Sequence, residues 1–98
     1  AGDPTALVDL MNNGADDAKD FALWSLSLAI SPENQGAIAE AGGVQPLINV
    51  LADKRFLIKE QSAAAIAKLC DNNPDTRSLI TAAGGVKPLI LLLSHTGE

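Results

Sequence analysis

The apolar residues between Ser31 and Pro74 recur every three to four positions in three successive stretches. This spacing places the apolar side chains of each stretch on one face of a helix. The pattern predicts a short helix over 32–41, a second over 44–52 and a third, longer helix over 57–70. The residues of the second and third helices expected to point inward are Leu47, Ile48, Val50, Leu51, Ile58, Ala65, Ile66, Leu69 and Cys70.

Polar and turn-forming residues separate the three stretches. Ser31 followed by Pro32 is typical of a helix start, because a serine hydroxyl caps the free backbone N–H groups and proline suits the first helical position. The pair Gly42-Gly43 is expected to end the short helix, since glycine adopts the left-handed backbone found past a helix terminus. The segments 53–55 and 71–74 then supply the polar break and the turn that bound the third helix.

The same pattern occurs three times along the chain. AGDPTALVDLM begins at residue 1, AGGVQPLINVL at residue 41 and AGGVKPLILLL at residue 83, so the starts are 40 and then 42 residues apart. The agreement extends to polar positions, since Lys19-Asp20 falls on Lys59-Glu60. A period of this length is typical of a solenoid built from stacked helical units. The glycines expected to form its structural turns are Gly42, Gly43, Gly84 and Gly85.

The length of the chain fits a single domain. We divide its 98 residues into a partial repeat at 1–31, a complete repeat at 32–73 and a partial repeat at 74–98. Because stacked units shield each other's apolar faces, the incomplete ends are expected to lack covering helices and to self-associate. The residues expected to be uncovered are Leu7, Val8 and Met11 at one end, and Leu89, Ile90, Leu92 and Leu93 at the other.

The segment ENQGAIAEAGGVQPLINVL, together with Trp-Ser-Leu-Ser at 24–27, resembles the armadillo repeat, and the resemblance extends over essentially the whole chain as about two and a half repeats. It implies an all-α fold, a right-handed α-solenoid of stacked three-helix repeats. The alternative is a solenoid of HEAT-like repeats, which usually have two helices and lack a Gly-Gly turn at this place.

The resemblance also implies a function. In that family the third helices line a concave groove that binds extended peptide segments, using a tryptophan and an asparagine four residues later. The tryptophan position is Trp24 in one repeat and Ala64 in the next, and the asparagine position is Leu28 and Lys68. Neither Leu28 nor Lys68 reproduces the paired donor and acceptor of an asparagine amide, so recognition of basic nuclear-import signals is not expected.

The candidate groove residues on this interpretation are Asp20, Trp24, Ser27, Leu28, Glu60, Ala64 and Lys68. A structural interpretation remains open for each of them. Trp24 can be a packed helix residue, and charges at helical spacing most often solvate an exposed face. Phe21, which follows Asp20 in the sequence, is expected to pack rather than to contact a ligand.

Composition narrows the choice of partner. The net charge of −5 argues against nucleic acid, which requires a basic surface. No apolar run has the length of a membrane span, and no secretory leader is recognisable. The single cysteine, Cys70, suits a small buried residue in a reducing compartment. We therefore expect an intracellular protein, cytoplasmic or nuclear, that binds neither nucleic acid nor membranes.

The sequence contains no catalytic or metal-binding set. His95 is the only histidine and lies near the C-terminus, where no Ser/His/Asp or Cys/His set is expected to assemble, and no second ligand stands at metal-binding spacing from it. Asp71, Asn73 and Asp75 resemble the start of a calcium loop, but Thr76 and Ala82 stand where its glycine and closing glutamate are required. The adjacent residues Asp16 and Asp17 are explained by capping and by the helix dipole. No enzyme activity, cofactor or metal is expected.

Two functions remain open from the sequence. The first is a non-enzymatic protein-interaction module that displays a groove for an extended peptide or partner segment. The second is a structural repeat fragment or engineered minimal solenoid that mainly self-associates through its uncovered end helices. The sequence does not identify the partner, the parent protein or the oligomeric state.

Overall fold

The computed structural model describes the backbone of residues 4–95 and the side chains of residues 5–90. Every regular element within the described backbone is helical, which confirms the all-α prediction. The handedness of the stack and its division into three-helix repeats stay predictions. The helices are α1 (Pro4–Asn13), α2 (Asp16–Ala29), α3 (Gln35–Glu40), α4 (Val44–Val50), α5 (Phe56–Cys70), α6 (Pro74–Ala82) and α7 (Val86–His95).

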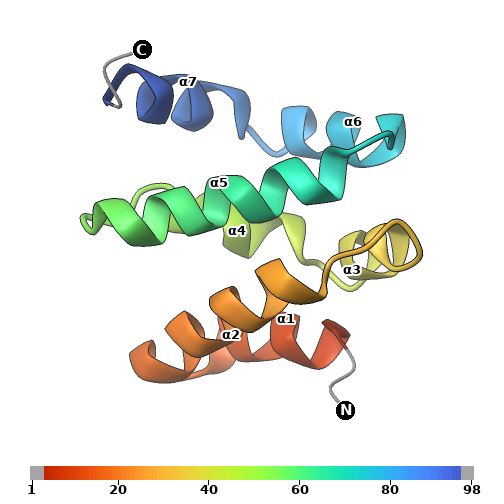
Figure 1. The fold of residues 1–98 in the computed structure, drawn as a ribbon, viewed down its shortest axis with the longest axis horizontal. Coiled ribbons are helices and arrows are strands. Elements are labelled where there is room, and N and C mark those ends of the chain that lie inside the picture. Colours follow the sequence, from red (N-terminus) through yellow and green to blue (C-terminus); the bar gives the residue numbers. More distant parts are fainter. Residues whose placement is uncertain (1–3, 96–98) are drawn as a thin grey trace.

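The helices are layered in chain order. Figure 1 shows α1 and α2 at the bottom, α3, α4 and α5 in the middle, and α6 and α7 at the top. The long helices α2 and α5 lie side by side, and α5 also packs on α4. Because α5 contacts helices before and after it, it is the central element of the core.

The core is aliphatic, as expected of a chain with 47% hydrophobic residues and three aromatic side chains. Leu23 and Leu26 of α2 interlock with Leu47 of α4 and with Ile66 and Leu69 of α5 in one continuous buried cluster. Full burial of each such side chain contributes about 1.5–3 kcal/mol. Of the inward residues predicted for α5, Ile58 and Cys70 are only half-buried, because they lie near the two ends of the helix.

The glycine pairs form the predicted turns. Gly42 and Gly84 have φ angles of 89° and 83°, a conformation that side chains with a Cβ rarely adopt. Gly43 fulfils a different requirement, because a Cβ built on it would stand 2.9 Å from the carbonyl oxygen of Ile38 and 3.2 Å from Cγ2 of Val8. Gly85 approaches Ile80 and Ile48 in the same way. The first glycine of each pair therefore allows the turn, and the second allows close packing.

Two predicted caps differ from the structure. The helix expected to begin at Pro32 begins at Gln35, after a turn in which Asn34 Oδ1 accepts a hydrogen bond from the backbone N–H of Ser31 and Asn34 Nδ2 donates to the carbonyl of Ala29. The amide of Asn34 thus binds the chain ahead of the helix, and Ser31 is not the cap. In α2, Ala15 is the N-cap without a side-chain bond, so Asp16 and Asp17 act only through the helix dipole.

The prediction of uncovered apolar residues is wrong for α1, and of the residues named for the other end only Ile90 is shown to be exposed. Val8 and Met11 are buried and Leu7 is half-buried, because α2 covers the inner face of α1. At the other end Ile90 is 57% exposed and Leu89 is half-buried. Leu92, Leu93 and His95 lie outside the residues whose side chains the structure describes.

Candidate functional site

Helix α2 exposes three large apolar side chains on one face. Phe21 is 67% exposed, Trp24 is 53% exposed and Leu28 is 78% exposed. Their spacing of three and four residues aligns them along the helix, while Leu23 and Leu26 on the opposite face are buried. The expectation that Phe21 packs inside the protein is wrong. The spacing of Phe21 from Trp24 was a signal in the sequence that both side chains share one face.

The equivalent positions of α5 are also exposed but carry smaller or charged side chains. Glu60, Ala64 and Lys68 are exposed, and Gln61, the equivalent of Phe21, is half-buried. Leu57, one turn earlier, is largely exposed as well. We define the α2–α5 face as the half-buried Asp20 together with seven exposed residues of the two helices: Phe21, Trp24, Leu28, Leu57, Glu60, Ala64 and Lys68.

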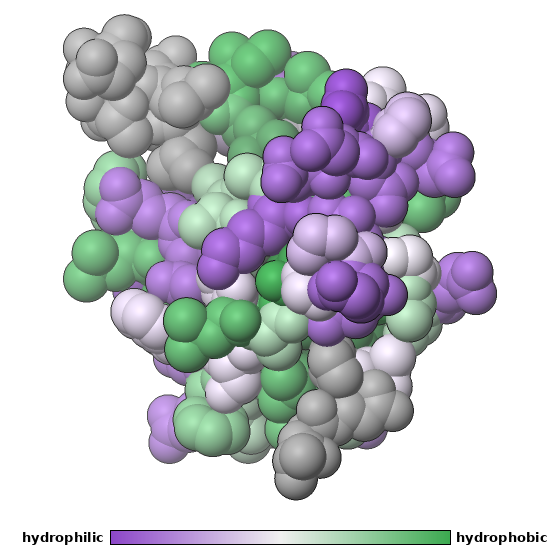
Figure 2. Space-filling model, turned by 45° about the vertical axis from the view of Figure 1, so that its right-hand side comes forward, coloured by the Kyte–Doolittle hydropathy of each residue, from purple (hydrophilic) through white to green (hydrophobic). Residues whose placement is uncertain are grey.

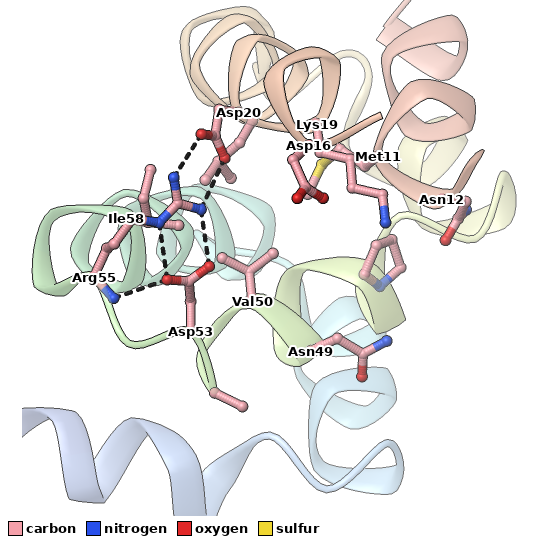
Figure 3. A pocket seen from close by; sticks show the side chains of 13 residues that line it. Met11, Asn12, Asp16, Lys19, Asp20, Asn49, Val50, Asp53, Arg55 and Ile58 are labelled. Carbon is pink, nitrogen blue, oxygen red and sulfur yellow. Dashed lines mark hydrogen bonds and ion pairs between the residues drawn. The ribbon is translucent and has the colours of Figure 1, made fainter. Parts of the chain in front are cut away.

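Asp20 is joined to the loop before α5 rather than left free. The guanidinium of Arg55 lies between two carboxylates, with Nη1 2.7 Å from Asp20 Oδ2 and Nη2 2.9 Å from Asp53 Oδ2 (Figure 3). The backbone N–H of Arg55 also donates to Asp53 Oδ1 at 2.8 Å. These hydrogen bonds from Arg55 lower the pKa of Asp53 to about 2, and the two carboxylates raise the pKa of Arg55. The single positive charge of Arg55 therefore compensates half of the negative charge of the two carboxylates.

Lys68 is likewise engaged across the two helices. Its Nζ donates to the carbonyl oxygen of Ser27 at 2.6 Å. The side chain of Ser27 is only 2% exposed, so Ser27 supplies a backbone acceptor and is not part of the ligand-accessible surface. The sequence analysis placed Ser27 among the groove residues because it adjoins Leu28. Successive residues of a helix point in different directions, so Ser27 is buried although Leu28 is exposed.

The Asp20–Arg55–Asp53 cluster lies at the rim of a cleft of about 430 Å³. The cleft runs between the α1–α2 connection and the α4–α5 connection, as Figure 3 shows with Asp16 and Lys19 above and Asn49 below. Apolar groups of Met11, Val50 and Ile58 complete its wall. Because Arg55 is bound to both acids, the cluster ties helix α2 to the connection between α4 and α5.

The remaining surface of the described side chains is mixed. Figure 2 shows apolar patches separated by polar ones on the face that it presents. Within the described residues no three His, Cys, Asp or Glu side chains are grouped so that they could hold a metal ion. Burial raises the pKa of the Cys70 thiol, which disfavours the reactive thiolate. No helix in the described part of the chain has the length and apolarity to cross a membrane.

One family model matches part of the chain. Residues 31–71, which contain α3, α4 and α5, match the family model of the Armadillo/beta-catenin-like repeat. No curated protein and no solved structure matches the chain. The resemblance drawn from the Ala-Gly-Gly turn and the helices around it is therefore confirmed for the middle of the sequence.

Proposed function

We propose that the chain is a non-enzymatic binding module whose α2–α5 face holds an extended segment of a partner protein. The match of residues 31–71 to the armadillo repeat model supports this, because such repeats generally mediate protein–protein interaction. The observation that carries the proposal is the exposed row of Phe21, Trp24 and Leu28. Large apolar side chains in a contiguous exposed row are typical of interaction surfaces, and aromatic residues dominate the energetics of such contacts.

The polar contacts of this face determine what kind of segment it accepts. Asp20 is already paired with Arg55, and Lys68 is bound to the carbonyl of Ser27. Leu28 and Lys68 occupy the positions where the family's asparagines hold a peptide backbone, so an amide clamp is absent from both. Recognition therefore rests on apolar side chains of the ligand, which pack on Trp24 and Leu28, rather than on basic side chains or on the ligand backbone.

A display library of random peptides tests the proposal, with the selected peptides measured individually by fluorescence anisotropy. Peptides rich in aliphatic or aromatic residues should be selected, and Trp24→Ala should weaken their binding at least about tenfold, as loss of a central aromatic anchor does. Leu79→Ala is the matched control, because Leu79 is a similarly exposed apolar residue on α6. It should leave the affinity unchanged.

Two results would contradict this function. One is equal weakening by Trp24→Ala and Leu79→Ala, which would show that binding depends on apolar exposure in general. The other is a library that yields no binder while Trp24→Ala reduces self-association, which would favour the structural interpretation.

A further inference from the structure

The last turn of α2 contains backbone carbonyls that the following chain leaves without a donor. In a helix, each carbonyl accepts from the backbone N–H four positions later. The N–H that would serve the carbonyl of Ser27 is that of Ser31, and it donates to Asn34 Oδ1 instead. The carbonyl of Leu28 would need the N–H of residue 32, which is a proline and has none. This end of α2 therefore depends on donors from side chains elsewhere in the fold.

Lys68 supplies one of the missing donors. Its Nζ lies 2.6 Å from the carbonyl oxygen of Ser27, 41 positions earlier in the sequence. A second donor is Nδ2 of Asn34, which is bonded to the carbonyl of Ala29. Of the two donors only the lysine carries a positive charge, which the negative C-terminal end of a helix dipole favours. Because the last turn of α2 has no basic residue of its own, Lys68 completes this helix end from α5.

The backbone of Lys68 is itself held in place. The residue is in the last turn of α5, and its carbonyl accepts a hydrogen bond from Gln35 Nε2 at 2.8 Å. The next residue, Leu69, is fully buried in the core. The ammonium group therefore reaches α2 from an anchored position, and the contact joins the C-terminal ends of the two helices.

A second contact joins the same two helices nearer their N-terminal ends. Arg55, the residue before α5, donates two hydrogen bonds of 2.7 and 3.1 Å to the carboxylate of Asp20. Trp24 lies on α2 between Asp20 and Ser27, the two residues that accept these contacts. The part of α2 that carries the tryptophan is thus held against α5 at both ends, each time by a basic side chain from the α5 side.

The internal repeat shows that the lysine contact is particular to the second repeat. The position equivalent to Lys68 in the first repeat is Leu28, whose side chain has no donor. The armadillo resemblance places a ligand-binding asparagine at this position. Here the polar group at the position is bonded to a carbonyl of the protein itself, so its effect on a ligand is transmitted through α2.

We propose that Lys68 is a positioning residue of the α2–α5 face, which completes the C-terminal end of α2 and thereby fixes the turn that carries Leu28. The inference rests on the proposed function of this face. It assigns Lys68 a contribution to affinity that requires no contact between the lysine and the ligand. Loss of the positive charge at this one residue loosens the end of α2 and weakens binding, so the junction of the two helices is a point of control over the face.

Amide hydrogen exchange followed by NMR tests the positioning role without a ligand. Lys68→Met keeps an unbranched side chain but removes the charge and the donors. The amides of residues 28–30 should then exchange at least about threefold faster, as expected when a helix end loses a favourable cation. Lys68→Arg should keep the original exchange rates, because a guanidinium is also a charged donor. Lys87→Met is the matched control, since Lys87 is an exposed lysine on α7, and it should leave these amides unchanged.

The affinity of peptides selected on the α2–α5 face is the second readout. The peptides used here have no acidic residues and an amidated C-terminus, so they cannot form an ion pair with Lys68. Lys68→Met should weaken their binding at least about threefold, because the ligand then has to order the end of α2 as it binds. Lys68→Arg and Lys87→Met should leave the affinity unchanged.

Three results would overturn the proposal. The first is unchanged exchange of residues 28–30 in Lys68→Met, and the second is a failure of Lys68→Arg to keep the original rates. The third is faster exchange in Lys68→Met with unchanged affinity, because Lys68 would then stabilise the fold without positioning the face. A library that yields no binding peptide counts against the proposed function itself, and is thereby distinguishable from these three results.

Discussion

The Nε2 atom of Gln35 lies 2.8 Å from the carbonyl oxygen of Lys68, across 33 positions of the sequence. The same atom donates to the carbonyl of Asp71, and Oε1 accepts from Asn73 Nδ2 at 3.2 Å. Gln35 is buried, so these groups have little water to replace a lost partner. One amide of the short helix α3 thereby closes the C-terminal end of α5 and holds the turn that leads to α6.

The first prediction follows from this contact. Gln35→Ala should lower the free energy of unfolding by about 1–3 kcal/mol, because it removes the side-chain donor shared by the part-buried carbonyls of Lys68 and Asp71 at the end of α5. Urea denaturation followed by circular dichroism measures the change. Gln45→Ala is the control, since Gln45 is exposed and bonds only to Asn49, one turn away on the surface. Similar losses in both variants would contradict the role of Gln35.

The second prediction contrasts two glycines near α3. Gly43→Ala should destabilise the protein by about 1–3 kcal/mol, because the new Cβ collides with the carbonyl of Ile38 and crowds Val8. Gly36→Ala should instead stabilise it by about 0.5–1 kcal/mol, because Gly36 is helical and has open space around its Cα. Thermal unfolding measures both. A gain in stability from Gly43→Ala would show that α1 and α3 can move apart at no cost.

Much of the helical architecture was predictable from the sequence, because apolar spacing and glycine pairs are local signals. The prediction of 57–70 for the third helix agrees with Phe56–Cys70 to within one residue, and the glycines at 42 and 84 have the expected left-handed backbone. The start of α3 was not predictable in this way. The side chain of Asn34, and not that of Ser31, forms the hydrogen bonds of the turn before α3. Its bond to the carbonyl of Ala29 depends on the path that the chain takes at the end of α2.

The candidate site was predicted less completely. Trp24 and Leu28 are exposed as the groove interpretation required, but exposure alone does not test whether they bind a ligand. The pairing of Asp20 with Arg55 joins residues 35 positions apart, and a one-dimensional pattern contains no signal for it. The same holds for the contact of Lys68 with the Ser27 carbonyl, which forms only because α2 and α5 lie side by side.

The third prediction concerns pH. Hydrogen bonds from Arg55 hold the pKa of Asp53 at about 2, below the value of about 3.9 for an unfolded chain. The unfolded state therefore takes up the proton first as the pH falls, so the stabilisation is fully present above about pH 4 and is lost as the pH approaches 2. Asp53→Asn should flatten the fall in melting temperature between these values. Because the pair is at the surface, added salt should reduce the difference.

A double-mutant comparison assigns this pH effect to the pair. In an Arg55→Ala background, Asp53→Asn should alter the melting temperature between pH 4 and 2 much less, since the guanidinium that lowers the pKa of Asp53 most is gone and only the backbone N–H at position 55 still donates to the carboxylate. An effect of equal size in both backgrounds would place the cause outside the Arg55–Asp53 contact.

The fourth prediction uses Trp24, the only tryptophan, as a reporter of the α2–α5 face. Because its side chain is about half exposed, iodide should quench its emission in the free protein, and capture of an apolar peptide should shift the emission to shorter wavelength and protect it from iodide. Trp24→Ala should cost at most about 1.5 kcal/mol, whereas Leu26→Ala in the same helix should cost about 2–5 kcal/mol because Leu26 is fully buried. Peptide binding that leaves the emission and quenching of Trp24 unchanged would place the ligand elsewhere. If Trp24→Ala destabilises the protein as much as Leu26→Ala does, Trp24 is a packing residue, and the apolar row on α2 then serves the fold rather than a partner.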